Sequence, residues 1–212
     1  ASEYYHLFNS FYKGTWDATN YAEAFTSLNR EEGRPDFNTI ITMDLLGNRP
    51  VLDTTRFINI QDFVRGGGQV PEGRMSPLQL ADLLRENGEK VLAGVKGFRA
   101  SDPMIQALEI ELTDLEQLAW LQLFFAWRIE ATLLLAEDIH RGTRQNSAQI
   151  DSHLARSLDC WREIIRLKER YNRETIPYLF NEQLNYRSYL ELLEEEAKNY
   201  HQIKTFRTHD LN

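Results

Sequence analysis

Glu137 and His140 are the residues best placed for metal chemistry, because they stand at helical spacing. Glu-x-x-His is half of the carboxylate-bridged di-iron motif, whose second half comes from a partner helix. An ordinary interpretation also fits: Glu137 can pair with Arg141 one turn further on, and His140 lies near the negative end of the helix dipole. We therefore predict no metal and no cofactor, with a metal-dependent enzyme using Glu130, Glu137 and His140 as an alternative.

Arg128 and Glu130 are charged residues inside the most apolar stretch of the chain. Two positions apart on a helix, they point to different faces and cannot pair with each other. Because an unpaired buried charge is costly, each is expected to have a partner on another helix. They could line a binding pocket. We favour the simpler interpretation, a structural ion pair or exposure at a gap between helices.

Other residues could serve acid–base or nucleophilic chemistry. Asp44, Asp53 and Asp62 could supply the two carboxylates of glycosidic catalysis, but Asp53 is sufficiently explained as a helix cap. Cys160 is the single cysteine. Within a helical pattern a lone cysteine is typical of a small buried apolar residue. We predict no catalytic residue in this chain.

The N-terminal region is rich in aromatic residues, which can stack on sugar rings. Trp16 and Tyr21, with Asp17 beside Trp16, are the first candidates for a sugar-binding groove. At helical spacing, however, aromatic residues more often belong to a core. Sugar binding is therefore kept as an alternative function.

Two long helices must position most of these residues. Thr113 and Glu116 form a capping box that opens an apolar helix over about 113–141, and a second helix with one apolar stripe spans about 147–172. The short loop between them makes the pair antiparallel. A helix that is apolar on every side is the central helix of a soluble bundle.

Further helices complete an all-α prediction. Ser76, Pro77 and Gln79 form the start signal of a helix running to about Phe98, and a last helix spans about 186–203. The predicted organisation is one helical domain, 1–212. Its parts are aromatic-rich helices over 1–65, including one ending near Leu28 and one from Asp36 or Asn38 to Leu46, a Gly/Pro linker over 66–75, and a helical bundle over 76–205.

Composition narrows the partners. The 24 basic and 32 acidic residues give a net charge of −8. Such a surface repels phosphate, so nucleic acid and anionic membranes are poor partners. The apolar helix is interrupted by Gln122, Arg128 and Glu130 too soon for a membrane span, so membrane insertion is not expected.

Three stretches together carry a family resemblance: Trp16–Ala24, Arg49–Val64, and Leu115–Leu121 followed by Leu154, Leu158 and Trp161. They resemble a helical region near the C-terminus of large, uncharacterised glycoside-hydrolase-like proteins of Bacteroidetes. The resemblance covers most of the chain but rests on packing motifs, and it brings no active-site motif with it. Gln122 stands where the family usually has a small residue.

The resemblance implies a function by association. It implies an exported, periplasmic or cell-surface parent protein with a neighbouring catalytic or sugar-binding domain. The leading prediction is a non-catalytic accessory domain of a larger carbohydrate-active protein, packed on that neighbour. It predicts an exposed apolar patch, placed on the N-terminal aromatic residues or on Val51–Val64.

Overall fold

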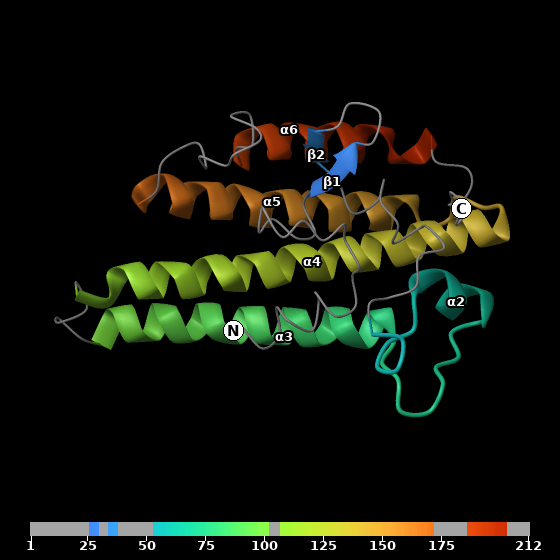
Figure 1. The fold of residues 1–212 in the computed structure, drawn as a ribbon, viewed down its shortest axis with the longest axis horizontal. Coiled ribbons are helices and arrows are strands. Elements are labelled where there is room, and N and C mark those ends of the chain that lie inside the picture. Colours follow the sequence, from blue (N-terminus) through green and yellow to red (C-terminus); the bar gives the residue numbers. More distant parts are fainter. Residues whose placement is uncertain (1–25, 30–33, 38–52, 102–106, 172–185, 203–212) are drawn as a thin grey trace.

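Four long helices lie side by side in chain order, each antiparallel to the next (Figure 1). They are α3 (Pro77–Ser101), α4 (Glu109–Arg141), α5 (Ser147–Tyr171) and α6 (Tyr186–Asn199), and the last continues into the short η2 (Tyr200–Gln202). This computed structural model describes residues 26–29, 34–37, 53–101, 107–171 and 186–202. The predicted all-α helical bundle is confirmed.

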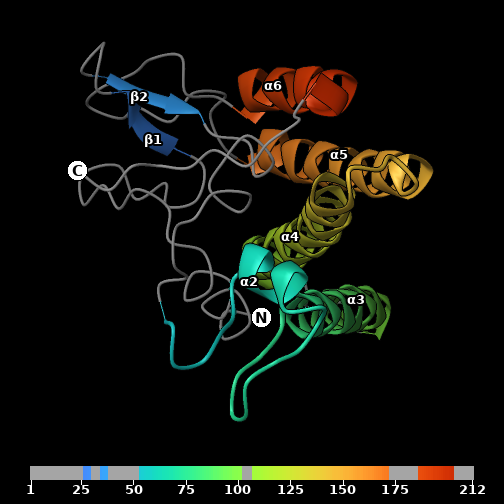
Figure 2. The ribbon, with the colours of Figure 1, turned by 90° about the vertical axis from the view of Figure 1, so that its right-hand side faces the viewer.

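The apolar helix α4 is the centre of the bundle, as its composition predicts. It packs on α3 and α5, which lie on either side of it (Figure 2), and also on α2 (Ile60–Arg65). By length and composition α4 could also span a membrane, but 72% of its most apolar 18-residue stretch is buried inside the bundle. The apolar surface of α4 is therefore used for packing.

The start of α4 differs from the prediction. The helix begins at Glu109, one turn before the expected capping box, and Thr113 lies buried within it. The Thr113 hydroxyl donates to the carbonyl oxygen of Glu109 (2.7 Å). Glu116 does not fold back as a capping residue, because arginines of α3 and α5 bind its carboxylate. Tertiary ion pairs thus replace the local capping pattern.

The turn between α4 and α5 follows its sequence closely. Gly142 adopts a left-handed conformation with φ of 64°, the usual way for a glycine to end a helix. The two oxygens of Asp138 accept from the Thr143 hydroxyl (2.9 Å) and the Asn146 backbone N–H (3.1 Å). A turn closed in this way sets α5 antiparallel to α4, and α5 ends within one residue of its predicted limit.

The capping box at the start of α3 forms as predicted. The Ser76 backbone N–H donates to the side chain of Gln79 (2.8 Å), and the Gln79 N–H donates to the Ser76 hydroxyl (3.0 Å). Further along, Gly88 lets α3 approach α4 closely. A Cβ at that position would lie 2.9 Å from Cγ of Leu123 and 3.0 Å from the carbonyl oxygen of Ala119.

Substitution of two glycines of α3 by alanine is expected to change the free energy of unfolding in opposite directions. Gly88→Ala should lower the free energy of unfolding by about 1–3 kcal/mol, because the added methyl group pushes against α4. Gly94→Ala should raise it by about 0.5–1 kcal/mol, since a Cβ there meets nothing within 4 Å and alanine favours the helix. Urea unfolding of both variants measures this. Equal effects of the two substitutions would contradict the close approach at Gly88.

The ambiguous segment before the glycine triplet is a short helix, α2, capped by the Asn59 side chain, which accepts from the Asp62 N–H (2.7 Å). The Gly/Pro segment that follows turns back on it. Met75 donates its N–H to the Arg56 carbonyl (2.7 Å) and accepts from the Ile58 N–H (3.2 Å). The predicted linker therefore returns the chain to the residues just before α2 and leads into α3.

A β-hairpin occupies positions where the sequence predicted parts of two N-terminal helices. The strands β1 (Thr26–Asn29) and β2 (Arg34–Phe37) pair antiparallel, with Thr26 opposite Phe37 and Asn29 opposite Arg34. The prediction of a helix to about Leu28 is wrong at its end, and the residues from Asp36 do not open a helix directly. Pro35 and the β-branched Thr26 suit extended backbone better than helix.

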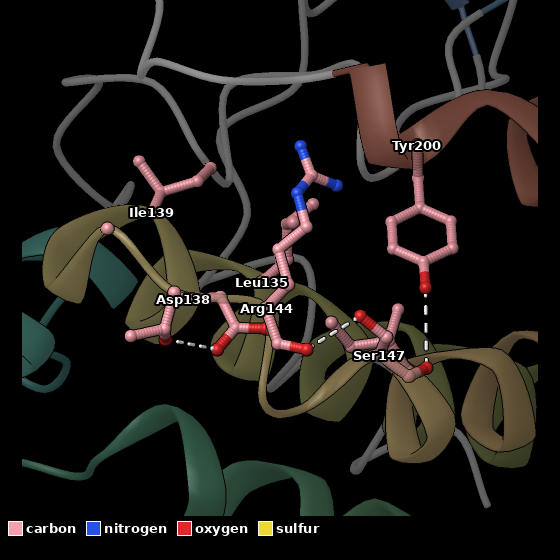
Figure 3. Close-up of a pocket in the computed structure, with 9 residues that line it drawn as sticks. Leu135, Asp138, Ile139, Arg144, Ser147 and Tyr200 are labelled. Atoms are coloured by element: carbon pink, nitrogen blue, oxygen red, sulfur yellow. Dashed lines mark hydrogen bonds between the residues drawn. The ribbon is translucent and has the colours of Figure 1, made fainter.

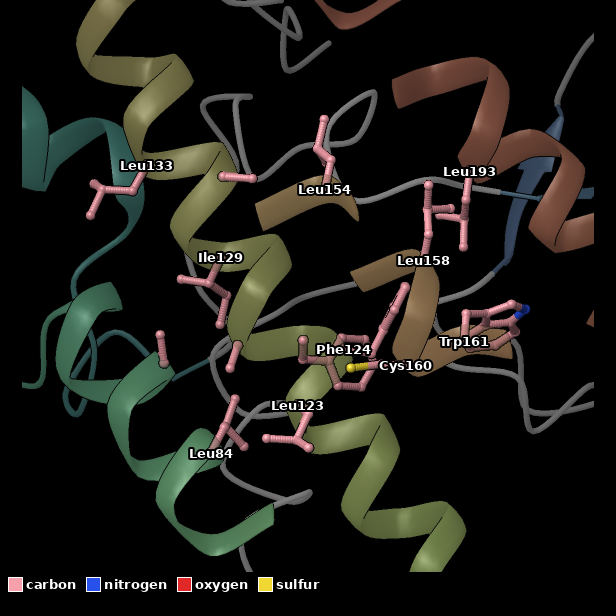
Figure 4. Close-up of a cluster of buried hydrophobic side chains, with 14 of the residues drawn as sticks. Leu84, Leu123, Phe124, Ile129, Leu133, Leu154, Leu158, Cys160, Trp161 and Leu193 are labelled. Atoms are coloured by element: carbon pink, nitrogen blue, oxygen red, sulfur yellow. The ribbon is translucent and has the colours of Figure 1, made fainter. Parts of the chain in front are cut away.

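The hydrophobic core joins α2, α3, α4, α5 and α6. Figure 4 shows Phe124 of α4 facing α5, where Cys160 and Trp161 lie, with Leu193 of α6 near Leu158. The rings of Phe124 and Trp161 are 5.1 Å apart, and that of Tyr189 lies 4.7 Å from Trp161. The Trp161 indole N–H donates to the Tyr186 carbonyl (2.9 Å), so Trp161 fixes α6 to α5.

Candidate functional site

Arg128 is a fully buried charge on α4, and its partner is Glu196 of α6. The Glu196 side chain is only 3% exposed, so the ion pair is shielded from water. The guanidinium also lies 5.8 Å from the ring centroid of Phe124. The prediction that Arg128 needs a partner on another helix is confirmed.

The surroundings of Arg128 are unusually apolar. Its Nε and Nη1 atoms are buried without a hydrogen-bond partner. Burial lowers the pKa of Arg128 to about 10, so the guanidinium remains charged at neutral pH. Among the described residues Glu196 is the one carboxylate partner of this charge, and its removal would take away that compensation in the core.

Glu130, on a different face of α4, joins the three central helices. One carboxylate oxygen accepts from Arg85 of α3 (2.6 Å), and the other lies 3.5 Å from Nδ1 of His153 on α5. Burial alone would lower the pKa of Arg85, but its hydrogen bonds to Glu130 and Asp82 raise it above the ordinary value. Glu130 therefore also has its predicted partner on another helix.

An aromatic ring lies at the centre of this group, here named the Trp127 cluster: Arg85, Trp127, Glu130, His153 and Arg156. The imidazole of His153 stacks on Trp127 with ring centroids 5.4 Å apart. The guanidinium carbons of Arg85 and Arg156 lie 4.9 Å and 4.6 Å from the indole centroid. Trp127 is thus occupied by side chains of α3 and α5, which leaves this ring poorly suited to stack on a sugar.

His153 and Glu130 form a histidine–carboxylate pair, the type of pair that transfers protons in many enzymes. Their facing atoms, Nδ1 and Oε2, are buried without a hydrogen bond. Burial lowers the pKa of His153; Glu130 opposes this, and the charges of Arg156 and Arg85 add to it. The imidazole is therefore neutral in the folded protein near neutral pH.

This cluster predicts a pH dependence of stability. Because the folded protein disfavours protonated His153, the unfolded chain binds a proton more readily below about pH 6.5, the ordinary histidine value. Neutral His153 therefore makes its full contribution to the free energy of unfolding above that pH, and this contribution falls as the pH drops towards the lowered pKa.

Urea unfolding at about pH 7.5 and about pH 5 should show a smaller loss of stability in His153→Gln than in the native chain. His140→Gln, at an exposed position, is the control. An unchanged pH dependence in His153→Gln would contradict the prediction.

Three glutamates separated by multiples of seven residues form a row on α4 that was not predicted. Glu109, Glu116 and Glu130 lie along one side of α4, with Leu123 at the intervening position. Arg99 of α3 binds Glu109 (3.0 Å) and Glu116 (2.5 Å). From α5, Arg170 reaches Glu109 (3.3 Å) and Arg166 lies 3.7 Å from Glu116. The seven-residue repeat was the available sequence signal, and these ion pairs join α3, α4 and α5.

The candidate metal ligands Glu137 and His140 have ordinary structural explanations. Glu137 pairs with Arg141 (3.4 Å), the pairing expected on one helix, and His140 is exposed beside them. Within the described part of the chain, no group of three or more His, Cys, Asp or Glu side chains could hold a metal ion. Cys160 is buried, and burial raises the pKa of its thiol to about 12, which disfavours a thiolate nucleophile.

The aspartate candidates are local caps where the structure describes them. Asp53 accepts from the Thr55 hydroxyl (2.6 Å) and backbone N–H (3.0 Å), which lowers the pKa of its carboxyl group. Its cap closes a turn rather than the expected helix. Asp62 accepts from the Asn59 amide (2.7 Å) at the start of α2. Asp44 lies outside the described residues, as do the sugar-binding candidates Trp16, Asp17 and Tyr21.

A pocket of about 180 Å³ lies at the α4–α5 turn (Figure 3). Its polar groups largely bind one another: the Ser147 hydroxyl donates to the Arg144 carbonyl (2.9 Å), and the Tyr200 hydroxyl lies 3.3 Å from the Ser147 carbonyl and 2.8 Å from Asp151. The pocket includes no residue of the Trp127 cluster. Its described lining therefore presents no catalytic pair.

The first turns of α4 present an exposed surface, here named the open face: Leu108, Ile110, Glu111, Asp114 and Leu115. The three apolar side chains are 46%, 62% and 40% exposed. At 100° per residue the five residues span an arc of about 160°. Further along the same side of α4, Phe125 and Ile129 are fully buried. The open face is thus the uncovered beginning of a side that is buried elsewhere.

The exposed apolar patch was predicted on the N-terminal aromatic residues or on Val51–Val64, and the second of these places is wrong. Phe57, Ile60 and Val64 of the Val51–Val64 segment are buried in the core. The N-terminal aromatic residues lie outside the described residues. Among the described residues, three of the exposed large apolar side chains lie at the start of α4, while Phe98 of α3 is 44% exposed and Leu78 lies at the opposite end of that helix.

The chain matches no protein-family model, no curated protein and no solved structure. The resemblance to glycoside-hydrolase-like proteins therefore stays a prediction.

Proposed function

We propose that this chain is a non-catalytic helical accessory domain of a larger carbohydrate-active bacterial protein and packs on a neighbouring domain of the same polypeptide. The carbohydrate-active parent rests on the family resemblance. The docking role rests on the open face of α4. Exposed apolar surface on an otherwise well-packed domain is typical of a site where another protein surface binds.

The continuity of the open face with the core carries the proposal. Ile110 and Leu115 lie on the side of α4 that holds Phe125 and Ile129, which are fully buried. Ile110 is 62% exposed, and exposure of this kind does nothing for the folding of the isolated chain. A neighbouring domain seated there would extend the existing core by about two helical turns.

The charged groups support a structural role. Arg128 and Glu130 each bind a side chain of another helix, and Glu137 binds Arg141. A catalytic group needs an approach to substrate, whereas Arg128 and Glu130 bind side chains of other helices and Glu137 binds along α4. Their arrangement supports a domain that is built to be rigid.

The test is a double variant, Ile110→Asp with Leu115→Asp. The free energy of unfolding of the isolated chain should change by less than about 1 kcal/mol, because both side chains are exposed. Binding to the neighbouring domain, added as a separate polypeptide and measured by calorimetry, should weaken by at least about a hundredfold.

Leu78→Asp is the matched control, since Leu78 is an apolar residue that is 44% exposed near the start of α3, outside the open face. It should leave binding unchanged. Native-like binding by the double variant, or an equal loss in Leu78→Asp, would rule out docking through the open face.

A further inference from the structure

We propose that the open face of α4 binds a partner segment that carries lysine or arginine side chains beside its apolar ones. This inference rests on the proposed docking function and adds the chemistry of the partner. It follows from the two acids that share the face with the exposed apolar residues.

Glu111 and Asp114 lie inside the arc bounded by Ile110 and Leu108, and both are exposed. Within the described part of the chain, neither forms an ion pair. The helix dipole favours an acid such as Glu111 in the first turn, but Asp114 lies beyond that turn. Local helix chemistry therefore explains only one of the two charges.

The opposite side of the same turns makes the contrast clear. There Glu109 and Glu116 bind Arg99 of α3 together with Arg170 and Arg166 of α5. The bundle thus supplies basic partners for the acids that face α3 and α5. Among the described residues, no basic side chain pairs with the acids of the open face, which fits a basic partner from outside.

Charge also separates the classes of partner. In a symmetric dimer through this face, Glu111 and Asp114 would meet the same acids of a second copy, and the whole chain carries a net charge of −8. An acidic partner would be repelled in the same way. A segment with apolar and basic side chains would bury Ile110 and Leu115 and satisfy both acids.

The test uses two synthetic amphipathic helical peptides with the same apolar face, one flanked by lysine and one by glutamate. The full chain should bind the lysine peptide at least about tenfold more tightly in fluorescence anisotropy, and added salt should reduce that difference. Glu111→Lys with Asp114→Lys should reverse the preference. Ile110→Asp with Leu115→Asp should weaken binding of the lysine peptide.

Equal affinity for the two peptides would overturn the inference while leaving docking through the open face intact. Failure of the folded chain to bind the lysine peptide would also overturn it, and the calorimetric test of the neighbouring domain then decides the proposed function by itself. A dimer in sedimentation that Ile110→Asp abolishes would overturn it in favour of a second copy.

Discussion

Glu196→Gln is expected to lower the free energy of unfolding by about 3–5 kcal/mol, the usual cost of breaking a buried ion pair by removing one partner. The substitution keeps the size of the side chain but leaves the fully buried guanidinium of Arg128 without its carboxylate. Because Nε and Nη1 of Arg128 already lack hydrogen-bond partners, little remains to compensate the charge. Urea unfolding followed by circular dichroism measures the loss.

Glu194→Gln is the matched control, two residues away on α6. Glu194 pairs with Arg162 of α5 (2.8 Å), but these side chains are 38% and 49% exposed. An exposed pair of this kind contributes only about 0–1 kcal/mol. If Glu196→Gln proved as mild as Glu194→Gln, the buried pair would not hold α6 in place.

Trp161→Ala is the second substitution with a large expected effect, about 3–5 kcal/mol. Trp161 is 3% exposed and contacts the rings of Phe124, Tyr186 and Tyr189. Its removal opens a cavity where α4, α5 and α6 meet. Hydrogen exchange should therefore show a greater loss of protection in α6 than in α3.

Trp161→Phe separates the indole hydrogen bond from the packing. It retains an aromatic ring but loses the N–H that donates to the Tyr186 carbonyl. A loss of about 1–2 kcal/mol is expected, smaller than that of Trp161→Ala. Uniform loss of protection across all helices in Trp161→Ala would show that α6 does not depend on this contact more than the rest.

Strong local signals made much of the bundle predictable. The cap of α3 at Ser76, the glycine that ends α4 and the apolar stripe of α5 each specify structure within a few residues. The start of α4 was predicted wrongly because Thr113 and Glu116 match a capping box in sequence. In the structure arginines of α3 and α5 bind Glu116 instead. The hairpin was missed because its strands are only four residues each, too short for a clear periodicity.

The charged site was predictable only in part. Helical geometry shows that Arg128 and Glu130 point apart, so each needs an outside partner. It does not show that the partners are Glu196 and Arg85, since these depend on how α6 and α3 are rotated against α4. The open face was hidden for a related reason: apolar residues on every side of a helix do not reveal which part is left uncovered.

Hydrogen exchange at residues 108–115 tests the docking role most directly. The chain is compared alone and joined to the neighbouring domain that we propose, with the exposed start of α3 around Leu78 as an internal reference. We predict that amide protection at the start of α4 rises by at least about tenfold in the joined protein, while protection around Leu78 stays the same. Unchanged protection at 108–115 in the joined protein would contradict the proposal that this domain packs on its neighbour through the open face.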